Sequence, residues 1–289
     1  MPVTELAYIG LCSADRIGWT SMLTEIVGLQ KCAAPNPNID YFRMDEREYR
    51  LFVEHSEKMG VQAIGWAVDS MATLEAFAER VSASGVRVTE GSKTAIEQRG
   101  ARALRCFEDP EGYKVELVFA PPAVEAPFKP SRAIAGFSTG VLGLGHIVLH
   151  CAQYKETVEF YENVLDFRIS DYIVWADADA TFMRCNPRHH SLAIINEALG
   201  MRSGNVNHIM FEMNSLADVG RAYDIVLDRD IPVIMTLGQH SNDQATSFYF
   251  VAPDGVGIEI GWNGLTIDDE NDWKVAKYDS TKLWGHRMN

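Results

Sequence analysis

Three short segments occur twice in this sequence, once in each half, and this internal repeat restricts the possible folds more than any other feature. The equivalent positions in the matched segments are Tyr8 and His146, Ala63 and His208, and Glu116 and Glu259. Successive positions are 55 and 53 residues apart in the first half and 62 and 51 residues apart in the second. A repeat that keeps its order and its spacing indicates a duplicated structural unit.

Hydrophobic periodicity divides each half into two modules of the same kind. Apolar segments typical of strands begin near residues 6, 61, 144 and 206, and segments with helical spacing follow them. Helices are expected over 14–29, 69–85 and 154–165, and after Ser215, where Asp218 three residues later resembles a capping box. Strand-like segments complete each unit, so the sequence predicts four β-α-β-β-β modules.

The modules are expected to form two tandem domains. Between residues 120 and 140 the periodic pattern stops, and four prolines with small residues indicate an extended connection. We therefore place an N-terminal domain at 1–135 and a C-terminal domain at 136–289. The predicted fold class is α+β, with two β-α-β-β-β modules in each domain curving into an open barrel.

The last two strands are expected to form a hairpin over 246–262. The turn Ala252-Pro-Asp-Gly255 predicts a type I turn with Gly255 in the left-handed conformation, which is a three-residue hairpin loop. That loop length places Tyr249 opposite Glu259 on one face of the sheet. Glu259 lies between two isoleucines, and a carboxylate that faces an apolar interior is costly unless a cation meets it. We therefore expect a cation beside Glu259.

Composition excludes several classes of protein. The 289 residues carry a formal net charge of −14, which argues against a nucleic-acid or membrane partner. Five scattered cysteines show no CxxC pair and no disulfide spacing, which favours a reducing cytoplasm. No segment is long and apolar enough for a membrane span, and the N-terminus lacks the features of a signal peptide.

Two histidines and one glutamate of the second half predict a metal site. His146 and His208 lie on the first strands of the third and fourth modules, and Glu259 lies on the last strand of the fourth. If the modules curve into a half-barrel, the three side chains converge on one point. Two imidazoles and one carboxylate form the facial triad of non-haem Fe(II) enzymes. The first half keeps only the glutamate, Glu116, so its equivalent site is expected to be vestigial and without metal.

The other histidines near this site are interpreted one by one. His150 shares a face with His146, but four strand residues span about 13 Å, so we interpret His150 as structural. His189 and His190 are adjacent on a segment expected to be extended, so only one of them can face the interior. His240 lies in a segment rich in Asn and Asp, and by itself this pattern indicates a solvent-exposed loop histidine.

Longer segments, mostly of the second half, form a distinctive combination. They are 144–149 (Leu-Gly-His-Ile-Val-Leu), 185–193 (with Arg-His-His), 207–210 (Asn-His-Ile-Met), 214–224, 238–240 (Gly-Gln-His), 248–250 (Phe-Tyr-Phe), 257–259 (Gly-Ile-Glu) and 279–286. On these segments the sequence resembles the type I extradiol ring-cleavage dioxygenases of the vicinal oxygen chelate superfamily, in particular those that act on 2,3-dihydroxybiphenyl. The resemblance covers the whole chain and is strongest after residue 140.

The resemblance implies a vicinal oxygen chelate (glyoxalase-like) fold and assigns roles to specific residues. Fe(II) would be the cofactor, with Mn(II) as the alternative, and O2 the co-substrate. The metal ligands would be His146, His208 and Glu259. The catalytic side chains would be His190, His240 and Tyr249, with His190 as the acid–base group. The substrate-binding residues would be Val148, Phe182, Asn207, Asn242, Asp243 and Thr281.

The expected reaction is extradiol (meta) cleavage of a 3-substituted, bicyclic catechol such as 2,3-dihydroxybiphenyl, with incorporation of both atoms of O2. Dihydroxynaphthalene, trihydroxybiphenyl, an alkylcatechol and dihydroxycumate remain open as substrates. Related isomerases and thiol transferases typically need a fourth protein ligand, which the paired halves do not supply. A more remote alternative is a metal-free protein of the same fold that sequesters a ligand. The expected partners are a small catechol and O2, and the expected assembly is a homo-oligomer between dimer and octamer.

Overall fold

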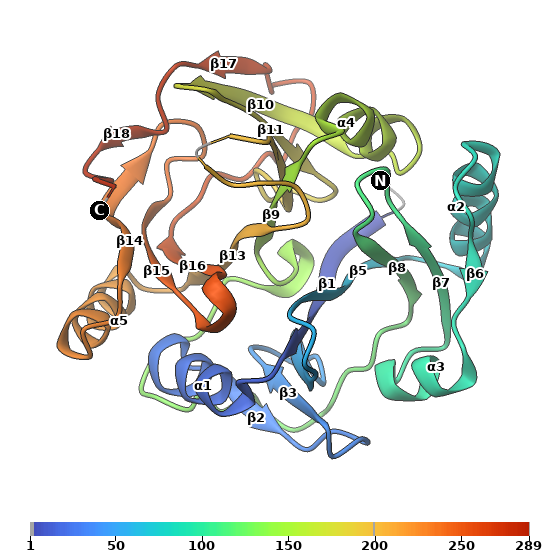
Figure 1. The fold of residues 1–289 in the computed structure, drawn as a ribbon, viewed down its shortest axis with the longest axis horizontal. Helices are drawn as coiled ribbons and strands as arrows, with labels where there is room; N and C mark the ends of the chain where they lie inside the picture. The colour runs from blue at the N-terminus through green and yellow to red at the C-terminus, as the bar shows by residue number, and fades with distance from the viewer. Residues whose placement is uncertain (1–2, 199, 289) are drawn as a thin grey trace.

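The computed structural model of the protein describes residues 3–198 and 200–288, and it contains two β-sheets that follow each other along the chain (Figure 1). The first sheet has eight strands in the order β2-β3-β4-β1-β5-β8-β7-β6, and the second has ten in the order β17-β10-β11-β12-β9-β13-β16-β15-β14-β18. Apart from the two added edge strands, the second order repeats the first. The α+β class and the curled, open sheets expected from the sequence are confirmed.

Each half contains two β-α-β-β-β modules. The elements of the first half are β1 (Val3–Ser13), α1 (Arg16–Ser21) with a π-helical turn (Met22–Val27), β2 (Gln30–Cys32), β3 (Ile39–Arg43), β4 (Leu51–His55), β5 (Gly60–Val68), α2 (Met71–Ala83), β6 (Thr89–Glu90), α3 (Lys93–Arg99), β7 (Ala103–Glu108) and β8 (Lys114–Phe119). Those of the second half are β9 (His146–Cys151), α4 (Tyr154–Asn163), β10 (Arg168–Trp175), β11 (Ala178–Arg184), β12 (Leu192–Asn196), β13 (Val206–Met213), α5 (Leu216–Asp228), β14 (Val233–His240), β15 (Thr246–Val251) and β16 (Gly257–Trp262). Two short strands, β17 (Ala276–Tyr278) and β18 (Lys282–Trp284), follow the last module.

Strand register confirms the matched positions of the repeat. Tyr8 pairs with Gly65 between β1 and β5, and Gly65 pairs in turn with Glu116 on β8. In the second half His146 pairs with Met210 between β9 and β13, and Met210 pairs with Glu259 on β16. The two central glutamates therefore occupy the same place in the two sheets.

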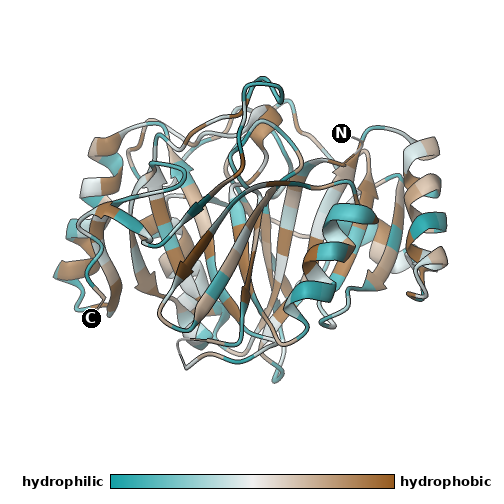
Figure 2. Ribbon diagram, turned by 90° about the horizontal axis from the view of Figure 1, so that it is seen from above, coloured by the Kyte–Doolittle hydropathy of each residue, from teal (hydrophilic) through white to brown (hydrophobic). Residues whose placement is uncertain are grey.

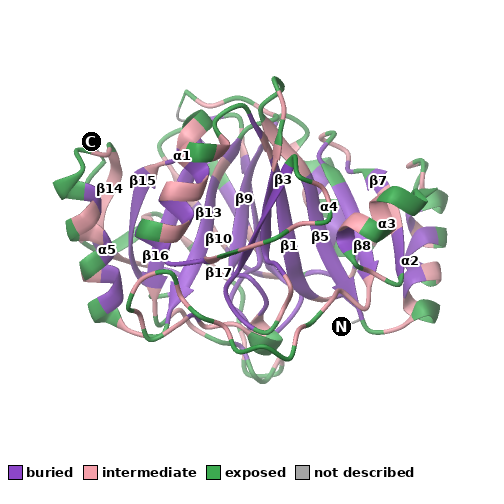
Figure 3. Ribbon diagram, turned by 90° about the horizontal axis from the view of Figure 1, so that it is seen from below, coloured by how far each residue is buried: buried purple, intermediate pink, exposed green. Residues whose placement is uncertain are grey.

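The helices and the strands bury complementary surfaces. α2 buries Leu74, Phe77 and Val81, which recur at helical spacing, and leaves its opposite side to solvent. Figure 2 shows apolar and polar residues alternating along the helices, and Figure 3 shows the buried strands lying between α5 at one end and α2 at the other. Burial of these apolar faces stabilises each sheet on the side that does not hold the polar cluster described below.

Local details differ from the sequence-based expectations in two places. The Ser215 hydroxyl accepts a hydrogen bond from the backbone N–H of Ala217, but Asp218 does not complete a capping box. Its carboxylate instead accepts hydrogen bonds from the backbone N–H of Ala135 and from Arg221. In the last hairpin, Asp254 as well as Gly255 has a left-handed φ, of 64° and 80°, so the turn is not type I.

The two halves are joined by reciprocal contacts between helices and hairpins. Trp19 on α1 donates a hydrogen bond from Nε1 to the Asp254 carboxylate, which lies in the β15–β16 turn, over 2.9 Å. In the opposite direction, the Tyr161 hydroxyl on α4 donates to the Asp109 carboxylate, which lies in the β7–β8 turn, over 3.1 Å. The first helix of each half is thus held by the last hairpin of the other half.

Among residues 3–198 and 200–288, no helix combines the length and the apolar character that a membrane-crossing helix needs.

Candidate metal centre and its surroundings

Three neighbouring strands bring together the side chains of His146 (β9), His208 (β13) and Glu259 (β16). The His146 and His208 Nε2 atoms are 3.1 Å apart, and they lie 3.0 and 3.2 Å from the Glu259 Oε2 atom. All three residues are buried. The predicted triad therefore converges on one point inside the second sheet.

The donor atoms of this triad are better placed to coordinate a metal ion than to hydrogen-bond to one another. Glu259 Oε2 is buried and receives no hydrogen bond of acceptable direction, although both imidazole nitrogens lie within contact distance. Atoms separated by 3.0 to 3.2 Å match three ligands at right angles around an ion with bonds of about 2.2 Å. Two nitrogens and one oxygen are a donor set typical of Fe(II), Mn(II) or Zn(II). The cluster could therefore hold a divalent metal ion.

Burial and charge shift the pKa values of Glu259 and His146. Burial would raise the pKa of the Glu259 carboxyl, but the close contacts of this carboxyl with His146, His208 and His240 hold this pKa well below its usual range. Burial lowers the pKa of His146, only partly offset by Glu259. An ionised carboxylate beside neutral imidazoles is the state that binds a metal cation.

His240 contacts the second carboxylate oxygen of Glu259, Oε1, and Tyr249 lies beside His240. The His240 Nε2 atom is 2.6 Å from the Tyr249 hydroxyl and 3.3 Å from Glu259 Oε1, while its Nδ1–H donates to the carbonyl oxygen of Thr281 over 2.9 Å. Burial lowers the pKa of His240, but Glu259 and Asp243 outweigh this and raise it to about 9. Tyr249 pairs with Glu259 across the hairpin, as predicted.

The solvent-exposed loop position suggested by the local pattern around His240 is wrong. His240 is the last residue of β14, and only 12% of its side chain is exposed. The local pattern is misleading because the chain reverses directly after this strand, and the polar residues that follow belong to the turn. The short strand β18 then pairs with the end of β14 and covers it.

His190 lies flat against His146 of the triad. Their ring centroids are 4.0 Å apart at an interplanar angle of 29°, and the Phe182 ring meets His190 edge-on at 4.9 Å. The Nδ1 atom of His190 is 3.1 Å from His189 Nδ1 and 3.9 Å from the Asp243 carboxylate. Burial, followed by the charges of His146 and His189, lowers the pKa of His190 well below its ordinary value.

The expectation that only one histidine of the His189–His190 pair faces the interior is wrong, because both are buried. They lie in an irregular segment between β11 and β12, where the alternation of a strand does not apply. His189 Nε2 is 3.0 Å from the Asp171 carboxylate, and Trp273 packs on the His189 ring. Asp171 thus contacts His189, and His189 contacts His190. No sequence pattern indicated this arrangement.

The six residues expected to bind substrate lie at several places around the triad. Val148 is buried beside the small side chains Ala178, Ala180 and Ala193. Asn242 donates a hydrogen bond to Asp171 over 3.3 Å. The others contact the site histidines: Phe182 and Asp243 lie beside His190, Thr281 accepts from His240 through its carbonyl, and Asn207 contacts His208. Their roles toward a substrate stay predictions.

At the equivalent position in the first half, an arginine contacts the buried glutamate. Arg99, at the end of α3, donates two hydrogen bonds to the Glu116 carboxylate, over 2.8 and 3.0 Å, and the Tyr8 hydroxyl donates to the same group over 2.5 Å. The guanidinium also lies over the ring of Phe52 at 4.2 Å. The cation that Glu116 needs is therefore a protein side chain from a helix that the sequence analysis missed.

We expect Arg99→Leu to destabilise the protein by about 3–5 kcal/mol, because it leaves the Glu116 carboxylate buried without a cation. Denaturant unfolding measures this change. The double variant Arg99→Leu/Glu116→Leu should regain most of the lost stability, since both charges are then gone. Metal content should stay the same in every variant. A double variant that is less stable than Arg99→Leu would contradict this account of the pair.

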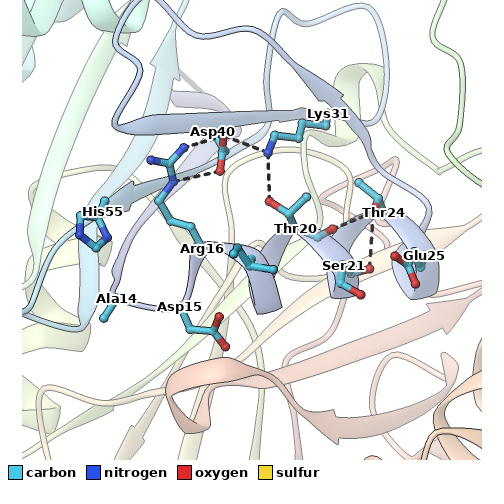
Figure 4. A pocket seen from close by; sticks show the side chains of 11 residues that line it. Ala14, Asp15, Arg16, Thr20, Ser21, Thr24, Glu25, Lys31, Asp40 and His55 are labelled. Carbon is cyan, nitrogen blue, oxygen red and sulfur yellow. Dashed lines mark hydrogen bonds and ion pairs between the residues drawn. The ribbon is translucent and has the colours of Figure 1, made fainter.

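A separate hollow on the surface of the first half lies beside α1 (Figure 4). Three of its charged side chains are paired within the hollow, since Arg16 and Lys31 both contact the Asp40 carboxylate, over 2.8 and 3.1 Å. These pairs satisfy the three charges without a ligand, and we assign no function to this hollow.

Comparison with known proteins gives consistent matches over the whole chain. Residues 143–260 match the model of the glyoxalase/bleomycin resistance protein/dioxygenase superfamily, and residues 6–55 match that of dihydroxybiphenyl dioxygenase BphC D1. A biphenyl-2,3-diol 1,2-dioxygenase of Paraburkholderia xenovorans is 38% identical over 99% of this chain and 96% of its own length. An iron-dependent extradiol dioxygenase of Rhodococcus jostii is 33% identical over 99% of this chain and 97% of its own length. The crystal structure of a halotolerant catechol dioxygenase has a TM-score of 0.94 and 34% identity, covering 99% of this chain and 95% of that one.

Proposed function

The chain belongs to the extradiol dioxygenases of the glyoxalase/bleomycin resistance protein/dioxygenase superfamily, and we propose that it opens the ring of a 3-substituted, bicyclic catechol beside its two hydroxyl groups, with both atoms of O2 entering the product. The observation that carries this proposal is the buried cluster of His146, His208 and Glu259, whose donor atoms lie 3.0 to 3.2 Å apart with His190 stacked against it.

The proposed cofactor is Fe(II), held by His146, His208 and Glu259, with Mn(II) as the alternative because it prefers similar ligands. The name of the iron-dependent relative supports iron. When bound, the metal would supply adjacent open positions for the catechol oxygens and O2 and a path for electron transfer between them. One carboxylate and two neutral imidazoles leave the site cationic, which favours an anionic catecholate.

The surrounding side chains are assigned to binding and proton transfer. Tyr249 and His240 lie beside Glu259, where they can hydrogen-bond a catecholate oxygen and stabilise charge on it. His190 uses its Nδ1 atom toward His189 and Asp243, so its Nε2 atom is the one available to take a proton from the substrate and return it. Its lowered pKa keeps the imidazole neutral and able to accept that proton.

The choice of a bicyclic catechol rests on the apolar side of the site and on relatives. Val148, Phe182 and a group of alanines supply small or flat apolar surface, which suits a second aromatic ring. Relatives with 37, 34 and 32% identity are named for 2,2',3-trihydroxybiphenyl, 3-methylcatechol and 1,2-dihydroxynaphthalene. These compounds, and dihydroxycumate, remain the alternative substrates for this chain.

Further features of the proposal concern the whole protein. The division into a metal-free domain at 1–135 and a catalytic domain at 136–289 is supported by the two separate sheets. A cytoplasmic location is supported by five cysteines without a disulfide. Assembly into a homo-oligomer is supported by apolar side chains on the edge strand β18, where Leu283 and Trp284 are 59% and 49% exposed.

Anaerobic reconstitution followed by a substrate panel tests the proposed function. The purified protein is loaded with Fe(II) or Mn(II), mixed with each candidate catechol, and then exposed to air, and the yellow ring-fission product is measured. We expect one metal ion per chain, ring opening with 2,3-dihydroxybiphenyl, and slower turnover of monocyclic catechols. Metal binding without ring opening of any catechol would contradict the dioxygenase. Failure to bind either metal would favour the ligand-sequestering alternative.

A further inference from the structure

We propose that His150, a histidine outside the metal site, is a positioning residue that fixes the orientation of the metal ligand His208 through the side chain of Asn207. This inference rests on the proposed metal site and deepens it, because it explains how one ligand is kept ready to bind. The three side chains form an unbroken chain of hydrogen bonds that begins at the backbone carbonyl of Asn196.

The first link fixes the tautomer of His150. Its Nδ1 atom lies 3.0 Å from the carbonyl oxygen of Asn196, and a carbonyl oxygen can only accept a hydrogen bond. The Nδ1 atom must therefore carry the hydrogen. His150 is fully buried, and burial lowers its pKa, so the ring is neutral and its Nε2 atom is left as an acceptor.

The second link fixes the amide of Asn207. Its Nδ2 atom lies 2.9 Å from His150 Nε2 and 3.6 Å from the sulfur of Met201, so both of its hydrogens face acceptors. Turning the amide over would place its oxygen against the lone pair of His150, which repels it. The Asn207 oxygen therefore points the other way, toward His208.

The third link reaches the metal ligand. The Asn207 Oδ1 atom lies 2.6 Å from His208 Nδ1, and an amide oxygen can only accept, so the His208 hydrogen is on Nδ1. This leaves the Nε2 lone pair pointing at His146 and Glu259, which is the state needed for binding a metal. A carbonyl group three side chains away thus determines which nitrogen of His208 is free.

A contact from the first half holds the start of this chain. The Tyr113 hydroxyl lies 2.9 Å from the backbone carbonyls of His150, on β9, and of Asn205, directly before β13. This contact fixes the backbone under His150 without touching its ring. A purely structural His150 would need only the bond to Asn196, and the state of Asn207 would then not depend on it.

The affinity for Fe(II), measured anaerobically by competition with a chelator, tests the proposal. We expect His150→Phe and Asn207→Ala each to weaken binding by about 10- to 100-fold, the usual effect of losing a partner behind a metal ligand. Because His150 acts through Asn207, the double variant should bind no more weakly than Asn207→Ala alone. His150→Gln, which keeps one donor and one acceptor, should restore most of the affinity.

A control and a second measurement separate positioning from a loss of stability. Cys151→Ala changes the neighbouring buried residue on the other face of β9, and it should leave the affinity for Fe(II) unchanged. In the metal-free protein at pH 9, nitrogen NMR of the histidine rings should show the hydrogen of His208 on Nδ1, and a mixture of tautomers in His150→Phe.

Two results would overturn the proposal. One is a folded His150→Phe variant with the wild-type affinity for Fe(II), and the other is additive losses in the double variant. The NMR measurement does not depend on metal binding, so it judges the hydrogen-bonded chain even if the wild-type protein binds no iron. Failure of the wild-type protein to bind iron would count against the proposed function and not against the hydrogen-bonded chain.

Discussion

Replacing Glu259 by alanine should leave the protein without tightly bound iron and lower ring cleavage by about three orders of magnitude or more. Metal catalysis contributes several kcal/mol, and each 1.4 kcal/mol corresponds to about tenfold in rate. Glu259 is the only carboxylate of the triad and lies 3.0 and 3.2 Å from the two imidazole nitrogens. Metal analysis after desalting and steady-state assays measure the two effects. One tightly held iron in Glu259→Ala would show that the ligand assignment is wrong.

The repeat supplies a matched control for this experiment. Glu259→Gln and Glu116→Gln make the same change at equivalent positions of the two halves, and only the first should reduce the iron content. Glu116 is already neutralised by Arg99, so its loss of charge should affect stability and leave one iron per chain. His146→Ala and His208→Ala should empty the site as Glu259→Ala does.

His190→Phe should keep iron and bind catechol while slowing ring opening by about two to four orders of magnitude, the range of general acid–base catalysis. A phenyl ring can keep the stacking on His146 and the edge contact with Phe182, so the metal ligands should stay in place. The phenyl ring, however, has no atom that can exchange a proton with the substrate. Single-turnover mixing of the iron–catechol complex with O2 measures the chemical step directly.

The exposed His55 gives the control for this substitution, and His55→Phe should react as the wild type does. His189 is unsuitable as a control, because it contacts both His190 and Asp171. A His190→Phe variant with wild-type single-turnover rates would exclude the acid–base role. Loss of iron from this variant would instead show that His190 supports the metal ligands.

The sequence predicted the parts of the site that depend on strand register. A strand has a period of two, and the order of the modules fixes which strands are neighbours, so the repeat was enough to place His146, His208 and Glu259 together. The facing of Tyr249 and Glu259 followed from the length of a hairpin loop. These inferences needed no knowledge of side-chain packing.

The features that the sequence did not predict depend on contacts between distant segments. α3 is a seven-residue helix, so its pattern is short, and the role of Arg99 appears only when that helix lies against Glu116. The burial of both His189 and His190 follows from an irregular segment with no fixed period. Asp218 did not complete a capping box because it binds the connection between the halves instead.

The crossed contacts between the helices and the hairpins bear on how a duplicated gene can diverge. In the first half Tyr8 and Ala63 stand at the positions that match His146 and His208, and changes there need only a partner for Glu116, which Arg99 supplies. Asp109 and Tyr113 are different, because each of them contacts a helix or a strand of the other copy. A change in the hairpin of the first copy therefore also affects the helix and the strand that it contacts in the second. Divergence of the polar cluster in one copy and retention of that whole copy are therefore compatible outcomes of a duplication.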